Sequence, residues 1–219
     1  MMSFALNEIE AMGKKAARGA GLAWGIAEEA GKAARWLSAH QLPGPELLSD
    51  LLAQNEGRHH ADLAPASVEG TWTASSGLLC PLIAGAALSD YAAVLWSGRP
   101  FELGGTSFPL LLAPYAQYCA LEVGAAIELT WNGVVAAVSP EALLTISGDE
   151  AAILVKSTPY VRCRAIAIDL VAGTAAAPVR RAVAAAAWDR LKEFTDRTYA
   201  PATQESRDLG AGADRIDSE

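Results

Sequence analysis

Cysteine is scarce in this chain. Cys80, Cys119 and Cys163 are odd in number and far apart in the sequence, and no CxxC pair is present. A disulfide framework needs an even set of cysteines, and a zinc knuckle needs closely spaced ligands. The sequence supports neither, and we expect three reduced thiols.

An excess of positive charge is also lacking. The 17 lysine and arginine residues stand against 25 acidic residues, which gives a formal net charge of −8. Binding to nucleic acid or to an anionic membrane surface needs a basic stripe, and none is visible. The sequence therefore predicts no nucleic-acid partner and no membrane partner.

Long apolar runs and a secretory signal are absent as well. The longest apolar run, residues 78–88, contains Pro81 and Gly85 and reaches about half of the roughly 20 residues that span a bilayer. We expect it to be a core segment. Residues 1–8 have neither a basic start nor an apolar centre, and such a start predicts a cytoplasmic protein.

Motifs for cofactors and metals are weak. The glycines near residue 20 follow no strand and lack the G-x-G-x-x-G spacing of a dinucleotide site. His59 and His60, with Glu56 and Asp62 nearby, are the only clustered metal-ligand types, but adjacent histidines on an extended chain point to opposite faces. We predict no cofactor and no metal.

Apolar residues make up 52% of the chain, and in the N-terminal part they recur at helical spacing. The predicted helices are residues 8–18, 24–39 and 46–54. Asn7 and Glu10 have the spacing of a capping box at the start of the first helix. Alanine and glycine on the facing stripes of the first two helices predict a tight helical hairpin.

From Thr71 onward the apolar period changes toward two, which is typical of strands. The expected strands are 71–73, 91–96, 108–112 and 164–170. Asn132-Gly133 predicts a type I′ hairpin turn within 127–138. A second hairpin is expected from 143–147 to 152–156. A last helix is expected to begin near Pro178, a residue suited to the first helical position.

These elements predict an α+β fold with an N-terminal helical subdomain, a mainly antiparallel sheet and a C-terminal helix. The chain forms one compact unit in this interpretation. Its expected parts are a helical subdomain (1–55), a linker or loop (56–70), a sheet core (71–177), a C-terminal helix (178–198) and a partly ordered tail (199–219).

The glycine-rich junction from Arg18 to Gly25 is the first candidate site. Glycines before a helix can leave backbone N–H groups free to hold an anion. We therefore take Arg18, Gly19, Gly21 and Trp24 as candidate ligand-binding residues. A tight helix–helix corner is the alternative interpretation of the same glycines.

The C-terminal tail is the second candidate site. Tyr199 and Ser206 offer hydroxyl groups, and Arg207 offers a forked guanidinium that suits a carboxylate or a phosphate. Gly210-Ala211-Gly212 adds exposed amides. The alternative is a disordered tail, because the segment is rich in acids, glycine and alanine.

Two further candidates lie in the central part of the chain. Cys80 is the candidate catalytic residue, although a buried, inert thiol is the favoured interpretation, because free cysteine is among the most buried side chains. Arg162, two residues from Arg164, is a candidate anion contact, and the alternative is a solvated sheet edge.

Both ends of the chain carry segments that resemble a known family. The segments are residues 6–10, 15–21, 24–31, 197–202, 206–207 and 210–213. They resemble an uncharacterised bacterial family that is known as a domain of unknown function. The resemblance covers nearly the whole chain, with its strongest motifs in Leu6–Gly31 and Arg197–Ala213. It implies no catalytic residue.

Two functions follow as predictions. The first is a cytoplasmic enzyme or ligand-binding subunit for a small anionic metabolite, a carboxylate or a phosphate, held by Arg18, Arg207 and glycine amides where the two ends meet. The second is a non-catalytic oligomerisation or accessory protein. A homo-oligomer is possible under either prediction.

Overall fold

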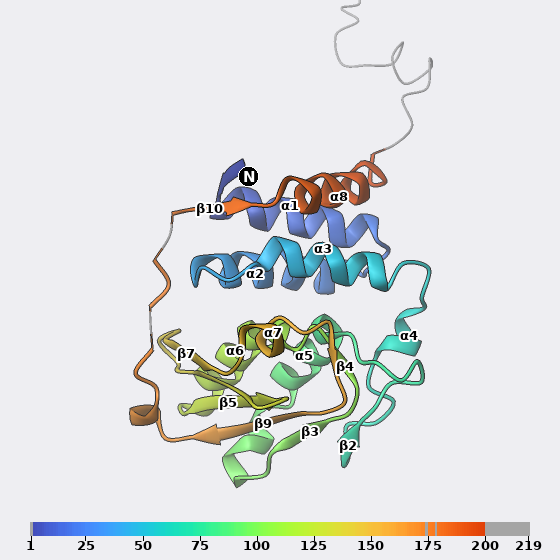
Figure 1. Ribbon diagram of the computed structural model, residues 1–219. Coiled ribbons are helices and arrows are strands. Elements are labelled where there is room, and N and C mark those ends of the chain that lie inside the picture. Colours follow the sequence, from blue (N-terminus) through green and yellow to red (C-terminus); the bar gives the residue numbers. More distant parts are fainter. Residues whose placement is uncertain (1, 174, 178, 200–219) are drawn as a thin grey trace, which may run out of the picture.

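A computed structural model describes residues 2–173, 175–177 and 179–199, and Figure 1 shows the arrangement of its layers. Helices α1 (Leu6–Gly19), α2 (Trp24–Ala39) and α3 (Gly44–Gln54) form a helical layer with α8 (Ala185–Asp196). In Figure 1, α1 and α8 lie outermost and α2 and α3 face the rest of the molecule.

The first three helices confirm the helical predictions for the N-terminal part. Helix α2 has the predicted bounds, and α1 and α3 each begin two residues earlier than expected. A capping box is present, but its residues are not the predicted Asn7 and Glu10. Ala5 is the N-cap, and the Glu8 carboxylate, rather than that of Glu10, accepts a hydrogen bond of 2.6 Å from the Ala5 backbone N–H.

Helices α1 and α2 pack at backbone distance. A Cβ placed on Gly31 would lie 2.5 Å from the backbone oxygen of Glu10, and a Cβ on Gly13 would lie 3.1 Å from the Cα of Gly31. Side chains larger than hydrogen would therefore separate the two helices. The tight helical hairpin predicted from the small residues is confirmed.

The N-terminal strand pairs with a strand that directly precedes α8. Strand β1 (Met2–Ala5) pairs antiparallel with β10 (Arg180–Val183). The rings of Phe4 and Trp188 stack beside it with centroids 3.6 Å apart. The expected helix from Pro178 is therefore corrected: a strand precedes it, α8 begins at Ala185, and Pro178 lies outside the described residues.

A six-stranded sheet with the order β2-β3-β9-β5-β6-β7 forms the opposite side of the molecule. Its strands are β2 (Thr71–Trp72), β3 (Phe101–Leu103), β9 (Val161–Ile166), β5 (Ala126–Trp131), β6 (Val134–Val138) and β7 (Leu144–Ser147). Only the β2–β3 pairing in this sheet is parallel. The fold is thus α+β, as predicted.

The β5–β6 hairpin confirms the Asn-Gly turn. Asn132 and Gly133 both have positive φ, at 43° and 78°. A type I′ turn needs positive φ at its two central residues, and asparagine and glycine adopt it at low cost. The turn fixes the register in which Trp131 faces Val134.

Several segments between the strands are helical where we expected strands or assigned no element. Residues 91–96 and 108–112 mostly fall in 3₁₀ turns, η1 (Ala92–Ser97) and η2 (Pro109–Leu112). Helices α5 (Pro81–Asp90) and α6 (Ala113–Val123) were not expected. Helix α5 is largely buried, and the exposed positions of α6 include the large apolar side chains of Tyr118 and Leu121, so the sequence shows no clear amphipathic period.

The second predicted hairpin is wrong in its return strand. After β7 the chain forms the short helix α7 (Glu150–Ile153), because the Asp149 carboxylate accepts a hydrogen bond from the Ala151 N–H. The next strand, β8 (Ser157–Thr158), pairs with β4 (Thr106–Ser107) in a separate sheet. The strand expected at 164–170 is β9, which ends at Ile166 before a 3₁₀ turn, η3 (Ile168–Leu170).

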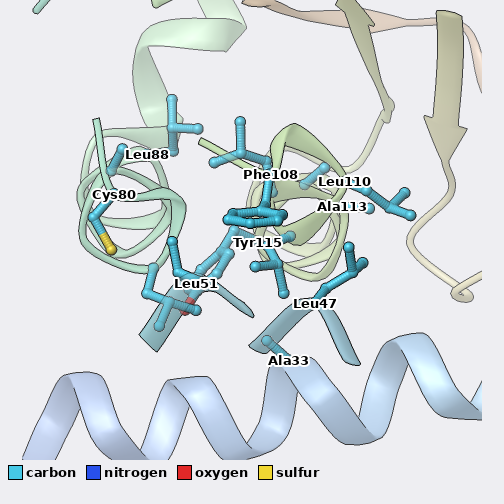
Figure 2. Packing of buried hydrophobic residues seen from close by; sticks show 14 of the residues in the cluster. Ala33, Leu47, Leu51, Cys80, Leu88, Phe108, Leu110, Ala113 and Tyr115 are labelled. Atoms are coloured by element: carbon cyan, nitrogen blue, oxygen red, sulfur yellow. The ribbon is translucent and has the colours of Figure 1, made fainter. Parts of the chain in front are cut away.

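Helices α5 and α6 connect the helical layer to the sheet. Helix α6 packs on β5 and β6 and also contacts α2. Figure 2 shows buried residues of this region: Cys80, Leu88, Phe108, Leu110, Ala113 and Tyr115, together with Leu47, Leu51 and Ala33. The Tyr115 ring fills the space beside Gly85, where a Cβ would lie 2.3 Å from the ring.

The segment expected as a linker contains the short helix α4 (His60–Leu63), which is tied to the start of α5. The Cys80 backbone N–H donates a hydrogen bond of 3.0 Å to the Leu63 oxygen. Within the described residues, none of the helices combines the length and the apolar character needed to cross a bilayer.

Candidate functional site

A partly enclosed cavity of about 230 Å³ lies where the α1–α2 turn, the end of α3, α4 and the start of α5 converge. Apolar residues make up a little more than half of its lining. The apolar side chains are those of Ala20, Leu22, Leu51, Leu52, Leu63, Cys80 and Leu82. Because these side chains come from four separate segments, the cavity is a product of the fold and not of one local motif.

Polar groups line the cavity on the side of the α3–α4 loop. They belong to Asn55, Arg58 and His60, and Arg58 and His60 are exposed. Among the described residues, no carboxylate lies within ion-pair distance of Arg58. By contrast, the neighbouring Glu56 binds Arg197 at 2.7 Å. The Arg58 guanidinium thus keeps its hydrogen-bond donors available beside an apolar cavity.

The glycine-rich junction contributes a wall to this cavity, but the backbone N–H groups of its lining residues Gly21 and Leu22 are occupied. The Gly21 N–H donates to the Arg18 oxygen at 3.0 Å, and the Leu22 N–H donates to the Ala17 oxygen at 3.1 Å. Gly21, with φ of 94°, makes the turn that these bonds close. The predicted capture of an anion by free amides is therefore corrected for Gly21, whose N–H is used by the turn.

Arg18 holds this turn in shape. Its Nη1 donates a hydrogen bond of 2.8 Å to the Leu22 oxygen, and its guanidinium lies over the ring of the exposed Trp24 at 5.1 Å. Neither Arg18 nor Trp24 lines the cavity. Arg18 is a positioning residue in this structure, because it fixes the loop that presents Leu22.

Gly19 has a different role from the one predicted. A Cβ at this position would lie 1.8 Å from the backbone oxygen of Phe194 in α8. Its missing side chain therefore allows close approach of two helices, as in the alternative interpretation of the junction, and Gly19 does not line the cavity.

Cys80 lies in the cavity wall as the residue before α5, but its thiol is poorly activated. Burial raises the pKa of the Cys80 thiol to about 11, although hydrogen bonds from the backbone N–H groups of Ile83 and Leu82 act in the opposite direction. A thiol with this pKa is almost fully protonated at neutral pH and is a weak nucleophile. All three cysteines are free and buried.

The remaining predicted residues do not join the cavity. Arg162, on β9, binds Glu102 with 3.3 Å between Nε and Oε1, and Arg164 binds Glu128 at 2.6 Å. Tyr199 is exposed after the end of α8. Ser206 and Arg207 lie outside the described residues, so the predicted meeting of the two ends stays a prediction.

A larger and more open groove runs between α2 and α6. Its main hollow of about 750 Å³ is lined in part by Arg35, Trp36 and Gln117, and it shares Lys32 and Tyr118 with a second hollow of about 550 Å³. Its cations are already paired: Lys32 with Glu29 at 2.7 Å, and Arg35 with Glu10 at 3.0 Å.

The described residues contain no group of three or more histidine, cysteine, aspartate or glutamate side chains arranged to hold a metal ion. Asp62 accepts a hydrogen bond of 3.0 Å from the Ser75 hydroxyl, at a shallow hollow beside Arg58. This part of the 56–70 segment therefore organises the loop next to the cavity.

Arg58 and the leucines of the cavity were missed by the sequence reasoning. The loop was interpreted as polar throughout, and Leu22 and Leu63 were not assigned to a common core. The sequence signal for Leu22 and Leu63 is weak: each is a single apolar residue beside a polar loop, and such a residue can anchor the loop.

A family model described as a protein of unknown function, DUF3726, matches residues 4–78. This match confirms the resemblance to a domain of unknown function, and the C-terminal segments lie beyond it. The cavity residues other than Cys80 and Leu82 fall inside the matched range. No curated protein matches the chain.

Proposed function

We propose that this protein binds a small anionic metabolite, a carboxylate or a phosphate, in the cavity beside Arg58. The observation that carries the proposal is a cation without a carboxylate partner, among the described residues, at a partly enclosed cavity with both apolar and polar lining residues. A mostly apolar pocket with few polar groups is typical of small-molecule sites.

Charge supports an anion at this place. A guanidinium offers paired donors that match a carboxylate or a phosphate, and the apolar wall on one side lowers the competition from water. In the α2–α6 groove, by contrast, Glu10 and Glu29 already neutralise the two cations. The smaller cavity is therefore the better anion site despite its volume.

The proposal is limited to binding, and the reaction of an enzyme is not part of it. Cys80 lines the cavity, but its raised pKa gives no support for a nucleophile at neutral pH. The cytoplasmic location belongs to the same proposal and is supported by three free thiols, which are typical of reducing compartments.

The oligomerisation alternative stays a prediction. Large apolar side chains are exposed on separate elements, among them Trp24 on α2, Trp96 on η1 and Leu121 on α6. A sedimentation-velocity measurement over a range of concentrations tests it directly.

Thermal unfolding with a panel of sodium carboxylates and phosphates, at constant ionic strength, tests the binding proposal. A ligand at a hundred times its Kd raises the Tm by about 5 °C. We expect this shift in the wild type and in Arg99→Met, a matched control in which another exposed arginine is removed, and we expect Arg58→Met to lose it. A panel without any stabilising anion, or an equal response of Arg58→Met, overturns the proposal.

A further inference from the structure

We infer that a second site binds a linear aliphatic diamine or polyamine in the smaller hollow of the α2–α6 groove, which we call the α5–α6 hollow. It is lined by residues that include Glu29, Lys32, Asp90, Tyr115, Tyr118 and Glu122. None of its lining residues belongs to the cavity beside Arg58. The inference therefore does not depend on the proposed function.

Negative charge dominates this hollow. Lys32 and Glu29 form an ion pair at 2.7 Å and neutralise each other. Asp90 and Glu122 are exposed, and in the described part of the chain neither has an ion-pair partner. These two carboxylates, in a protein with a formal net charge of −8, attract a cation.

Both carboxylates also stand at the unfavourable end of a helix. Asp90 is the last residue of α5, Glu122 is the last but one of α6, and neither helix has a basic residue in its last turn. The C-terminal end of a helix carries a partial negative charge, which repels a carboxylate and attracts a cation. A bound ammonium group therefore relieves a repulsion at both helix ends.

The Tyr115 hydroxyl is a second and independent sign of a ligand. Tyr115 is 1% exposed, and its hydroxyl oxygen has no hydrogen-bond partner among the described residues. Burial raises the pKa of this hydroxyl well above its usual value, and the Glu29 carboxylate raises it further, so the group is uncharged and lies near the Glu29 side of the hollow. An ammonium N–H that enters from the hollow supplies the missing partner of a costly buried polar group.

The exposed surface beside the carboxylates suits an aliphatic amine. Tyr118 is 40% exposed and Leu121 is 56% exposed, and both line the hollow from α6. An ammonium group is attracted to the face of a tyrosine ring. The methylene groups of the amine gain by covering Leu121.

The arrangement of the carboxylates favours an organic cation over a metal ion. Glu29, Asp90 and Glu122 come from three helices, and the described residues contain no acidic group arranged to hold a metal ion. A metal ion needs several oxygen atoms that converge on one point. A diamine carries a charge at each end of its chain, so it can meet two separate carboxylates.

The experiment is titration calorimetry of the full-length protein with putrescine, cadaverine and spermidine, at constant ionic strength. Butylamine, 1,4-butanediol and Mg²⁺ are the comparison ligands. We expect putrescine to bind about fivefold more tightly than butylamine, because it meets a second carboxylate. We expect no binding of the uncharged diol.

Two isosteric variants test the carboxylates. Asp90→Asn and Glu122→Gln should each weaken putrescine binding by about fivefold. Glu193→Gln removes another exposed carboxylate on a helix, α8, and should match the wild type. An equal loss in Glu193→Gln would show general attraction to an acidic protein and overturn the site.

Tyr115→Phe separates a ligand contact from a structural role. Because the variant loses a buried hydroxyl without a partner, its Tm in the absence of amine should be at least that of the wild type. Its affinity for putrescine should nevertheless fall by about tenfold. Unchanged putrescine binding in this variant overturns the contact with the hydroxyl.

Two results overturn the inference as a whole. One is the absence of amine binding, and the other is binding of butylamine or Mg²⁺ as tight as that of putrescine. Neither result affects the anion site at Arg58, because the two sites share no lining residue.

Discussion

Gly31 and Gly25 lie in the same helix, and their surroundings differ completely. At Gly31 a Cβ would lie 2.5 Å from the backbone of α1, whereas at Gly25 nothing lies within 4 Å. Gly21, in the preceding turn, is also open but has a φ of 94°. Within eleven residues, glycine thus allows close packing at Gly31 and a positive φ at Gly21, and it meets no steric requirement at Gly25. Clustered glycines are therefore poor evidence for a ligand until each environment is known.

Gly31→Ala should have the largest effect. The new methyl group must separate α1 from α2 because its nearest contact is backbone, and we expect a loss of about 3 kcal/mol in the free energy of unfolding. Urea unfolding followed by circular dichroism measures it. A stability within about 0.5 kcal/mol of the wild type would show that the helices can move apart at little cost.

Gly21→Ala should have an intermediate effect that arises from the backbone. Space is available at this position, but an alanine at positive φ costs about 1 to 2 kcal/mol. The same unfolding measurement applies, with the anion-induced shift in Tm as a second readout, because the turn positions Leu22 at the cavity. A stability equal to that of the wild type would mean that the turn adopts another conformation.

Gly25→Ala should have the smallest effect and the opposite sign. The position is helical and open, so alanine should stabilise the protein by about 0.5 kcal/mol through the lower entropy of the unfolded chain. It is the matched control for Gly31→Ala. A clear destabilisation would indicate an unseen neighbour at this face.

The sequence predicted what local periodicity and turn chemistry decide. The three N-terminal helices and the Asn132-Gly133 hairpin were recognised because their patterns are local. Helices α5 and α6 were missed because neither has a clear amphipathic period: α5 is largely buried, and α6 exposes the apolar Tyr118 and Leu121. Strand β10 was missed because its partner, β1, lies almost the whole chain away.

The candidate site was predicted only in fragments. Gly21 and Cys80 were selected from the sequence, and the structure brings both to one cavity. The structure does not support the chemistry expected of them. The Gly21 N–H is bonded within its turn and the Cys80 thiol is buried, and neither fact is visible in the sequence. Arg58 became a candidate only when the absence of an ion-pair partner, among the described residues, was visible.

The packing of α8 has a consequence for the order of synthesis. Helix α8 packs on the first three helices: the backbone of Phe194 lies against Gly19, and Arg190 binds Asp50 of α3 at 2.6 Å. During translation, the first three helices therefore leave the ribosome long before α8 has been synthesised. Residues 4–78, excised alone, would leave the sides of α1 and α3 that α8 occupies open to water, so a minimal expression fragment needs the C-terminal helix supplied in cis or as a separate peptide.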